Sequence, residues 1–276
     1  MPRRYEYLLG DARRERARLR AQADLWDPVS RALFDRLGIR RGWRVLEIGP
    51  GSGSLHLDLR RRVAGPVDAV EQSPVFASQL AARIRRDGFG SGRTWLSDLS
   101  AATLPTNHYD LIFARWVFLF LPRPERRIRQ LAAALKPGGR LVVQDYHRET
   151  LALIPRPPEW RRFVDADLAF FASQGGDVSI GGRLPALFRR ARLRPDPTHV
   201  TIKTGRPGSA VWRWLSTYVL GVMDRYAEFP PFTREDARRL RRHWLRASRD
   251  PAALLIGPAV LDVVGRKPRK RFTMKG

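Results

Sequence analysis

Cysteine is absent from the 276 residues, which excludes disulfides, zinc clusters held by thiolates and thiol nucleophiles. Long apolar runs are missing too: residues 116–121 are too few, and residues 252–264 are interrupted by Gly257, Pro258 and Asp262, so neither predicts a membrane-spanning helix. The first residues, Met-Pro-Arg-Arg-Tyr-Glu-Tyr, contain no apolar signal core, and we expect a cytoplasmic protein. No cluster of histidines and carboxylates has metal-ligand spacing, so no metal site is predicted.

Acidic residues are few relative to basic ones. The chain has 52 Lys and Arg against 27 Asp and Glu, a formal net charge of +25. Such a surface attracts phosphate, anionic lipid or acidic substrates through its long-range field. The arginines are spread along the whole length, however, and an arginine-rich composition on solvated faces explains them as well. Only residues 266–271 form a compact basic cluster, within a tail (266–276) that we expect to be flexible.

Apolar residues occur in short runs that alternate with longer amphipathic segments. This pattern is typical of repeated β-α units around a mostly parallel sheet. A first helix is expected at 11–25, and Asp27-Pro28 then provides an N-cap and a first-turn proline for a second helix to residue 37. The expected strands are 44–48, 67–70, 93–96, 109–114 and 140–145, with helices at 54–62, 73–87 and from 124 to the Leu-Lys-Pro-Gly-Gly run at 135–139.

The alternation of strands and helices ends after Tyr146. Thr233-Arg-Glu-Asp236 has the pattern of a capping box, which predicts the start of a helix. A last strand near 254–265 is expected to close the sheet. The other elements expected in this part are helices at 159–173, 183–191 and 210–226, the capped helix to residue 247, and a strand at 199–204.

Three glycines occupy alternate positions where the first strand ends. From Val45 the sequence reads Val-Leu-Glu-Ile-Gly-Pro-Gly-Ser-Gly, a buried strand that runs into a turn and then a helix. Without Cβ atoms, Gly49, Gly51 and Gly53 allow a tight turn and the close approach of a ligand, toward which the first helical amides point. The spacing differs from the G-x-G-x-x-G of dinucleotide sites, because no third glycine follows three places after the second.

The pattern Glu-x-Gly-x-Gly-x-Gly, which begins at Glu47, resembles motif I of the class I S-adenosylmethionine (SAM) methyltransferases. Tyr-Asp-Leu-Ile-Phe-Ala-Arg-Trp at 109–116 resembles their fourth-strand motif, whose last residues, here Arg115 and Trp116, reach the ligand. Leu-Lys-Pro-Gly-Gly at 135–139 resembles their helix-to-strand turn. The order of these motifs predicts this superfamily, which implies an α/β fold with a Rossmann-like, seven-stranded doubly wound sheet, a helical cap inserted before the last strand, and SAM as the cofactor.

Further cofactor contacts follow from this resemblance. Glu71 ends the second strand, 18 residues after Gly53, where a carboxylate can accept hydrogen bonds from both hydroxyls of a ribose. A nicotinamide enzyme would carry an acid there too. Asp98 resembles the acidic position that binds the adenine amino group. The remaining residues that we place in the cofactor site on this resemblance are Glu47, the three glycines, Gln72 and Leu99.

The flanks of the chain resemble a bacterial subgroup of small-molecule methyltransferases. In this subgroup N-terminal helices fold over the cofactor, and we expect Gln22 to contact it. The matching positions are Tyr7, Gly10, Arg18, Leu19 and Gln22. We therefore expect residues 1–40 to form this N-terminal segment, 41–265 the methyltransferase domain, and about 206–250 a helical cap on the substrate side.

The chemistry expected of such an enzyme places few demands on the protein. Because the methyl group of SAM is already activated, the protein must chiefly hold the acceptor in line with it and exclude water. A base is needed only where the acceptor must lose a proton. His147, just after the fifth strand, is the candidate catalytic base, and Tyr146 and Arg148 could position the acceptor. The cap aromatics expected to shape an apolar acceptor pocket are Trp212, Trp214, Tyr218, Tyr226, Phe229 and Phe232.

We therefore predict a SAM-dependent methyltransferase that modifies an oxygen or nitrogen of a small molecule. The charge of +25 keeps a second hypothesis open, methylation of RNA at ribose or guanine. A nucleic-acid partner is less favoured, because residues 114–117 read Ala-Arg-Trp-Val where adenine-amino methyltransferases have Asn/Asp-Pro-Pro-aromatic. Two further hypotheses stay open: a SAM-binding or nucleotide-sensing protein without turnover, and a nicotinamide oxidoreductase. The sequence does not predict the oligomeric state.

Overall fold

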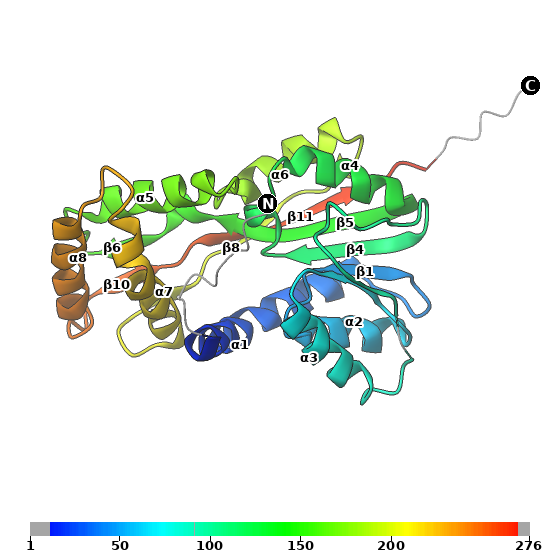
Figure 1. Ribbon diagram of the computed structural model, residues 1–276, viewed down its shortest axis with the longest axis horizontal. Coiled ribbons are helices and arrows are strands. Elements are labelled where there is room, and N and C mark those ends of the chain that lie inside the picture. Colours follow the sequence, from blue (N-terminus) through cyan, green and yellow to red (C-terminus); the bar gives the residue numbers. More distant parts are fainter. Residues whose placement is uncertain (1–11, 91, 270–276) are drawn as a thin grey trace, which may run out of the picture. The chain divides into compact units, whose positions relative to one another are not determined.

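The computed structural model describes residues 12–90 and 92–269, with side chains from residue 20 onward (Figure 1). By their internal contacts these residues group into two compact units. The helical unit comprises the described residues up to Val29 together with His147–Val178 and Thr201–Ala259. The sheet unit comprises Ser30–Tyr146, Ser179–Val200 and the described residues from Val260. The domain boundaries expected at residues 40 and 265 stay a prediction.

A sheet with parallel central strands organises the sheet unit. Its strand order is β3-β2-β1-β4-β5-β11-β7, and β8 also pairs with β11. Neighbours from β3 to β5 are parallel, whereas β7 is antiparallel to β11. The strands are β1 (Val45–Ile48), β2 (Asp68–Glu71), β3 (Thr94–Leu96), β4 (Tyr109–Arg115), β5 (Leu135–His147), β7 (Arg194–Pro195), β8 (His199–Thr201) and β11 (Ala259–Arg266).

Apolar side chains cover both faces of this sheet. In β4, Leu111 and Phe113 belong to one core cluster with residues of two helices, while Ile112 and Ala114 are equally buried outside that cluster. Successive side chains of a strand point to opposite faces, so the sheet is buried on both sides and the predicted Rossmann-like α/β fold is confirmed. The helices of this unit are α2 (Ser54–Val63), α3 (Pro74–Ile84), α4 (Pro124–Ala134), α6 (Ile180–Arg190) and the short η1 (Phe118–Phe120).

The N-terminal residues form one helix, α1 (Ala12–Leu37), and the predicted break at Asp27-Pro28 is wrong. Pro28 lacks an N–H and normally interrupts a helix. Here Trp26 and Phe34, on either side of Pro28, are both fully buried, so packing on both sides outweighs the local signal. Of the predicted N-terminal motif, Tyr7 and Gly10 lie outside the described residues, as do the side chains of Arg18 and Leu19.

The fifth strand is longer than predicted. β5 begins at Leu135, directly after α4, and includes the Lys-Pro-Gly-Gly run that the sequence analysis assigned to a turn. The pairing with β4 shifts register between Tyr109 and Leu111, and Gly138 takes a positive φ of 84°. The glycines thus act as an irregularity within the strand rather than as a separate turn.

The helical unit combines helices with a small second sheet that the sequence analysis did not anticipate. Its strands are antiparallel and ordered β6-β10-β9. The predicted strand at 254–265 is in fact two strands, because Gly257-Pro258 separates β10 from β11 and each pairs in a different sheet. The elements are η2 (Arg148–Thr150), β6 (Ala152–Ile154), α5 (Trp160–Ser173), β9 (Thr204–Gly205), α7 (Ala210–Tyr226), α8 (Arg234–Ala247) and β10 (Leu254–Ile256).

Within residues 12–90 and 92–269, no helix has the length and apolar character needed to cross a membrane.

The predicted capping box at the start of α8 is present. Thr233 Oγ1 accepts a hydrogen bond from Asp236 N at 3.1 Å, and Asp236 Oδ2 accepts from Thr233 N at 3.0 Å. Arg162 of α5 also donates two hydrogen bonds to the Asp236 carboxylate, which lower its pKa to about 2. Because this pKa lies below its unfolded value of 3.8, the interaction stabilises the fold above pH 3.8 and is lost as the pH falls toward 2.

Thr233→Ala is expected to lower the free energy of unfolding by about 1 kcal/mol, because the substitution removes the side-chain acceptor of the cap. Urea denaturation of the full chain measures the change. Thr217→Ala is the matched control: Thr217 is exposed, and its Oγ1 only donates to Arg213 O within α7. An equal loss in both variants would show that the cap contributes nothing specific.

Candidate functional site

The glycine-rich turn joins β1 to α2. Gly49, Gly51 and Gly53 have φ angles of 65°, 54° and 81°, in a region that residues with a Cβ rarely adopt. The Gly49 amide donates to Val70 O at 2.8 Å, which ties the start of the turn to β2. The path of the backbone therefore requires all three glycines.

The space beside these glycines differs from one to the next. A Cβ on Gly49 would lie 2.7 Å from Cγ2 of Val117, and one on Gly53 would lie 2.7 Å from Cδ1 of Leu80. A Cβ on Gly51 would meet no heavy atom within 4 Å. Gly49 and Gly53 thus permit close packing, whereas Gly51 borders a space in which a ligand can approach the backbone.

The carboxylate of Glu71, at the end of β2, is bonded to the same turn. Its Oε2 accepts a hydrogen bond from Gly51 N at 3.1 Å, and its Oε1 accepts from Ser73 N at 2.8 Å. The residue is only 5% exposed, and this burial raises the pKa of its carboxyl group despite the hydrogen bonds. Since a carboxylate oxygen has more than one lone pair, Glu71 can still accept hydrogen bonds from two ligand hydroxyls.

Glu47 has a partner within the protein. It is buried in β1, and its Oε2 lies 3.0 Å from Nδ1 of His56, a fully buried residue of α2. The pair fixes the glutamate between the strand and the helix that flank the glycine turn. The contact between Glu47 and the cofactor stays a prediction.

The residues predicted to bind near the adenine differ in accessibility. Asp98 is exposed after β3, with Oδ1 accepting from Ser100 N at 2.6 Å, and Gln72 is exposed after β2. Leu99 is buried, and its carbonyl accepts from Gln130 Nε2 at 3.0 Å. The side chains of Asp98 and Gln72 are thus open to a ligand, while that of Leu99 is part of the protein core.

Two apolar side chains at this edge of the sheet were missed by the sequence analysis. Leu96 ends β3, pairs in register with Glu71 and is 56% exposed, and Val75 in the first turn of α3 is 54% exposed. Ligand sites commonly combine apolar side chains with a few polar groups, and this edge of the sheet offers both. The available signal was their place, Leu96 at the end of strand three and Val75 after strand two, but the sequence does not distinguish them from core residues.

Arg115 and Trp116 lie at the end of β4 and are held there by several contacts. Arg115 Nη1 donates to Ser30 Oγ at 3.0 Å, and its guanidinium lies 4.5 Å from the centroid of the Trp116 ring. Trp116 has a positive φ of 54° and stacks on Tyr146 with ring centroids 5.4 Å apart. A bulky residue with positive φ persists only where its surroundings enforce it, a situation that is common at functional sites.

Behind Arg115, a chain of hydrogen-bonded polar side chains, buried except for Arg36, joins three elements of the sheet unit. Ser30 Oγ donates to Gln144 Oε1 at 2.5 Å, and Gln144 Nε2 donates to Asp262 Oδ1 at 2.6 Å. Arg36 Nη2 then donates to Asp262 Oδ2 at 2.6 Å, while burial raises the pKa of this carboxyl group. No pattern in the sequence indicates this chain of hydrogen bonds, because its members come from α1, β5 and β11.

Gln22 and His147 belong to the helical unit, and their predicted roles stay predictions. Gln22 is buried in α1. His147 is the last residue of β5 and half-buried; its Nδ1 is buried and finds no hydrogen-bond partner among the described residues. Arg148, which was expected to position an acceptor, is buried with its guanidinium 4.7 Å from the centroid of the Tyr218 ring.

The cap aromatics lie mainly in the core of the helical unit. All but Phe229 are buried, and the rings pack on one another, as in the pairs Trp212–Trp244 and Phe163–Phe232. Their burial shows that packing is their main role in this structure. An acceptor pocket lined by them stays a prediction.

Comparison with known proteins agrees with this geometry. A family model described as a methyltransferase domain matches residues 46–143, the segment that contains the glycine turn, Glu71 and β4. The ubiquinone/menaquinone biosynthesis C-methyltransferase UbiE of Azotobacter vinelandii is 32% identical over 151 residues, which are 52% of this chain and 57% of that protein. The chain thus spans only a little over half the length of this curated relative.

Solved structures share the fold at low sequence identity. The YcgJ protein of Bacillus subtilis matches with a TM-score of 0.58 and 17% identity, covering 86% of this chain and 97% of that one. Phosphoethanolamine N-methyltransferase 2 of Haemonchus contortus, solved in complex with SAM, matches with a TM-score of 0.52 and 15% identity, covering 86% and 52%. The family-model match thus shows that residues 46–143 are similar to a methyltransferase domain, in agreement with the motifs in that segment, and the solved structures show a shared fold.

Proposed function

We propose that this protein is an enzyme that transfers a methyl group from SAM to an oxygen or nitrogen of a small-molecule acceptor. The observation that carries the proposal is the Glu71 carboxylate, hydrogen-bonded to Gly51 N beside the space that this glycine leaves open. A buried carboxylate next to a glycine turn provides acceptors for a sugar diol and amides for a charged tail. Both fit an adenosyl amino acid.

The other residues of the sheet unit have compatible roles in this proposal. Glu71 accepts from the ribose hydroxyls, Leu96 and Val75 flank the purine, and Asp98 accepts from its amino group. The turn from Gly49 to Gly53, with Glu47 and Arg115, receives the amino acid portion. SAM supplies the activated methyl group, so these residues need only to bind, orient and exclude water. Where the acceptor carries a proton, His147 is the proposed base.

Carbon is a second candidate for the methylated atom. The relative with 32% identity over 151 residues is named a C-methyltransferase. Fold alone does not decide between acceptor atoms, because one fold hosts many reactions. RNA methylation and SAM binding without turnover also stay open.

Binding and product analysis test this proposal directly. SAM and S-adenosylhomocysteine are expected to bind with dissociation constants of roughly 1 μM to 1 mM, and NADH fluorescence is expected not to change on addition of protein. Incubation of the full chain with SAM labelled at the methyl carbon and with cell extract then yields a labelled small molecule, whose NMR shift identifies an O-, N- or C-methyl group. Binding of NADH without SAM overturns the proposal, and SAM binding with no labelled product favours a non-catalytic protein.

A further inference from the structure

The outer face of α8 carries a row of arginines. Arg234, Arg238, Arg242 and Arg246, here called the arginine row, follow one another at intervals of four residues and are all exposed. Four residues advance a helix by about 6 Å, so the row presents one guanidinium group at each such step. Arg239, Arg241 and Arg249 flank the row.

The inner face of α8 holds the helix in place without these arginines. Ala237, Leu240, Trp244 and Ala247 are buried on that face, and the capping box fixes the first turn. The stability of the helix therefore sets no requirement for positive charge on the outer face. Like charges at positions i and i+4 repel one another, so the arginine row lowers the stability of the isolated helix.

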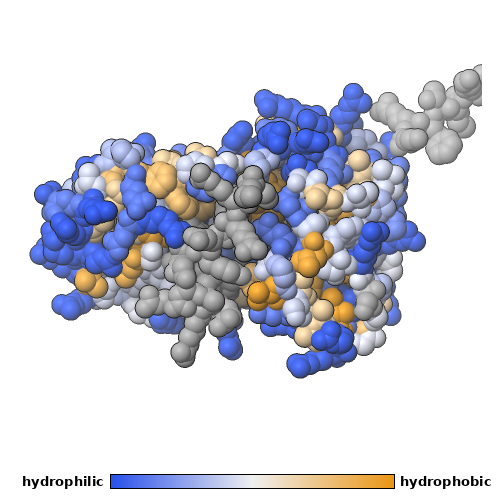
Figure 2. Space-filling view, in the orientation of Figure 1, coloured by the Kyte–Doolittle hydropathy of each residue, from blue (hydrophilic) through white to orange (hydrophobic). Residues whose placement is uncertain are grey.

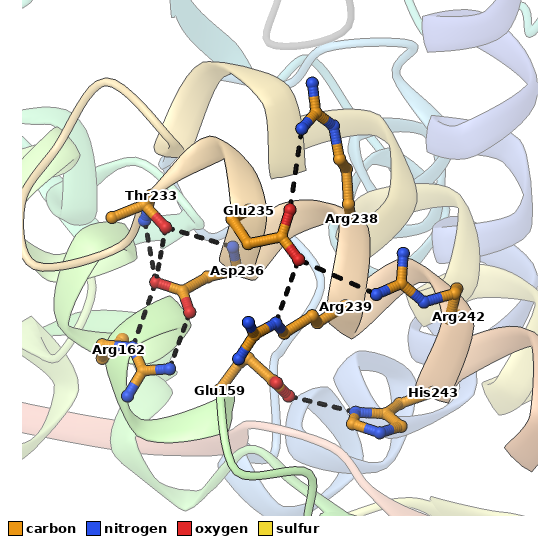
Figure 3. A network of polar contacts seen from close by, with 9 residues as sticks. All are labelled: Glu159, Arg162, Thr233, Glu235, Asp236, Arg238, Arg239, Arg242 and His243. Carbon is orange, nitrogen blue, oxygen red and sulfur yellow. Dashed lines mark hydrogen bonds and ion pairs between the residues drawn. The ribbon is translucent and has the colours of Figure 1, made fainter.

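Few acids compensate the charge on this face (Figure 3). Glu235 is shared by three arginines: its carboxylate lies 3.0 Å from Arg239, 3.6 Å from Arg238 and 3.9 Å from Arg242. Asp224 pairs with Arg241 at 3.3 Å. Asp224 and Glu228 also line a hollow beside Arg234 and Arg238. The arginines of α8 thus outnumber the acids beside them, and hydrophilic residues dominate the surface over α8 in Figure 2.

We infer that the outer face of α8 binds the phosphate backbone of duplex DNA. The guanidinium group donates two parallel hydrogen bonds to a phosphate and keeps its charge at any physiological pH. A duplex carries one negative charge for roughly every 1.7 Å of its axis, so each arginine of the row can meet a phosphate without a matching register. This inference is independent of the proposed methyl transfer.

Other anionic partners fit this face less well. A bilayer surface would require apolar side chains among the arginines, and the outer face of α8 offers Leu245, 51% exposed, as its exposed large hydrophobic residue. A protein interface would require an apolar or aromatic centre, which the face lacks for the same reason. Single strands bind through stacking on exposed aromatic rings, and none of the exposed large hydrophobic residues among those described is aromatic.

Between the two kinds of duplex, the geometry of an exposed helix favours DNA. The major groove of B-form DNA admits an α-helix, with phosphates on either side of it. The major groove of A-form RNA is too deep and narrow for side chains to enter. A helix whose exposed face consists mainly of arginine therefore matches the DNA groove better.

Fluorescence anisotropy with a short labelled DNA duplex tests the inference on the full chain. Four phosphate contacts predict that log K falls with log salt concentration with a slope of about −3.6, measured between roughly 50 and 200 mM salt. Replacement of the arginine row by glutamine (Arg234→Gln, Arg238→Gln, Arg242→Gln and Arg246→Gln together) is expected to weaken binding at least roughly tenfold and to remove the roughly 3.6 units of slope that its four contacts contribute. Replacement of the same four residues by lysine keeps the charge and is expected to retain most of the slope.

The matched control removes four exposed arginines from the sheet unit: Arg126→Gln, Arg129→Gln, Arg189→Gln and Arg190→Gln. Its net charge equals that of the first variant, and its DNA binding is expected to stay close to that of the parent. An equal loss in both glutamine variants overturns the inference, because the general charge of the protein would then explain the binding. Absence of DNA binding by the parent, or tighter binding to duplex RNA or to vesicles of anionic lipid, overturns it as well. Unchanged binding of S-adenosylhomocysteine shows that the variants remain folded.

Discussion

Glu71→Gln is expected to raise the dissociation constant for SAM and for S-adenosylhomocysteine by about 100-fold. Hydrogen bonds to a charged group contribute about 1.5–3 kcal/mol each, and the carboxylate is proposed to accept one from each ribose hydroxyl. A loss of about 2.7 kcal/mol corresponds to the factor of 100. Isothermal titration calorimetry measures this change in both ligands.

The glycine turn provides a second reason for the expected loss of SAM affinity in Glu71→Gln. The same carboxylate accepts from Gly51 N and Ser73 N, so it also fixes the glycine whose open side faces the proposed ligand. An amide provides one acceptor oxygen and would oppose its NH2 group to the second backbone N–H. The substitution should therefore weaken both the direct contact and the order of the turn.

The pH dependence of binding follows from the pKa of Glu71. Burial raises this pKa above its ordinary value of 4.5, so the ionised carboxylate opposes folding rather than supporting it. As the pH rises from 4.5 through the raised pKa, stability falls, while affinity for the ribose diol increases because the acceptor becomes ionised. In Glu71→Gln, the affinity for SAM should no longer increase with pH in this range.

Glu125→Ala provides the control for removal of one carboxylate. Glu125 lies in the first turn of α4, and its carboxylate is 4.0 Å from Arg183. A surface ion pair at this distance contributes little to stability. SAM affinity should therefore be unchanged in this variant. If Glu71→Gln binds SAM as tightly as the parent does, the assignment of the ribose to Glu71 is wrong.

The residues near the proposed cofactor site were predictable because their signals are local. The three glycines that indicate the turn lie within five residues of one another, and the position of Glu71 was predicted from the end of the next strand. The capping box of α8 lies within four residues and was predicted correctly. In each case the chain neighbours that create the structure are also neighbours in the sequence.

Features that join distant parts of the chain were not predicted. Gln144 is 114 residues from Ser30 and 118 from Asp262, and each of these side chains is an ordinary polar residue in its own segment. The split of the predicted last strand depends on β6 and β9 as partners of β10. α1 likewise continues through Pro28 because side chains on both sides of the proline are buried, which the local sequence does not predict. Tertiary packing decides these features, and one sequence alone does not show it.

A buried cluster in the helical unit is another feature that joins distant parts of the chain and was not predicted. Asp167 of α5 is 1% exposed, and its Oδ1 accepts from Tyr218 at 2.7 Å and from Tyr226 at 2.6 Å. Its Oδ2 lies 3.6 Å from Arg148, which is also buried. Burial raises the pKa of both tyrosines, so their hydroxyl groups stay protonated and donate at physiological pH.

Asp167→Ala is expected to lower the free energy of unfolding by about 3–5 kcal/mol, because the substitution removes the acidic member of a buried ion pair. The two tyrosine hydroxyls also lose an acceptor, although one of them can then donate to the other, 2.8 Å away. Urea denaturation measures the loss, and hydrogen exchange is expected to locate it in α5 and α7.

Asp165→Ala tests whether burial causes this effect. Asp165 lies two residues away on the same helix and pairs with the exposed Arg161, so its loss should change stability by less than about 1 kcal/mol. Arg148 directly follows His147, the proposed base, and its backbone N–H donates to Val178 O, so we expect the buried cluster to influence the position of His147. Asp167→Ala should therefore lower turnover more than SAM affinity. If its turnover equals that of Asp165→Ala, the buried cluster does not influence the proposed base.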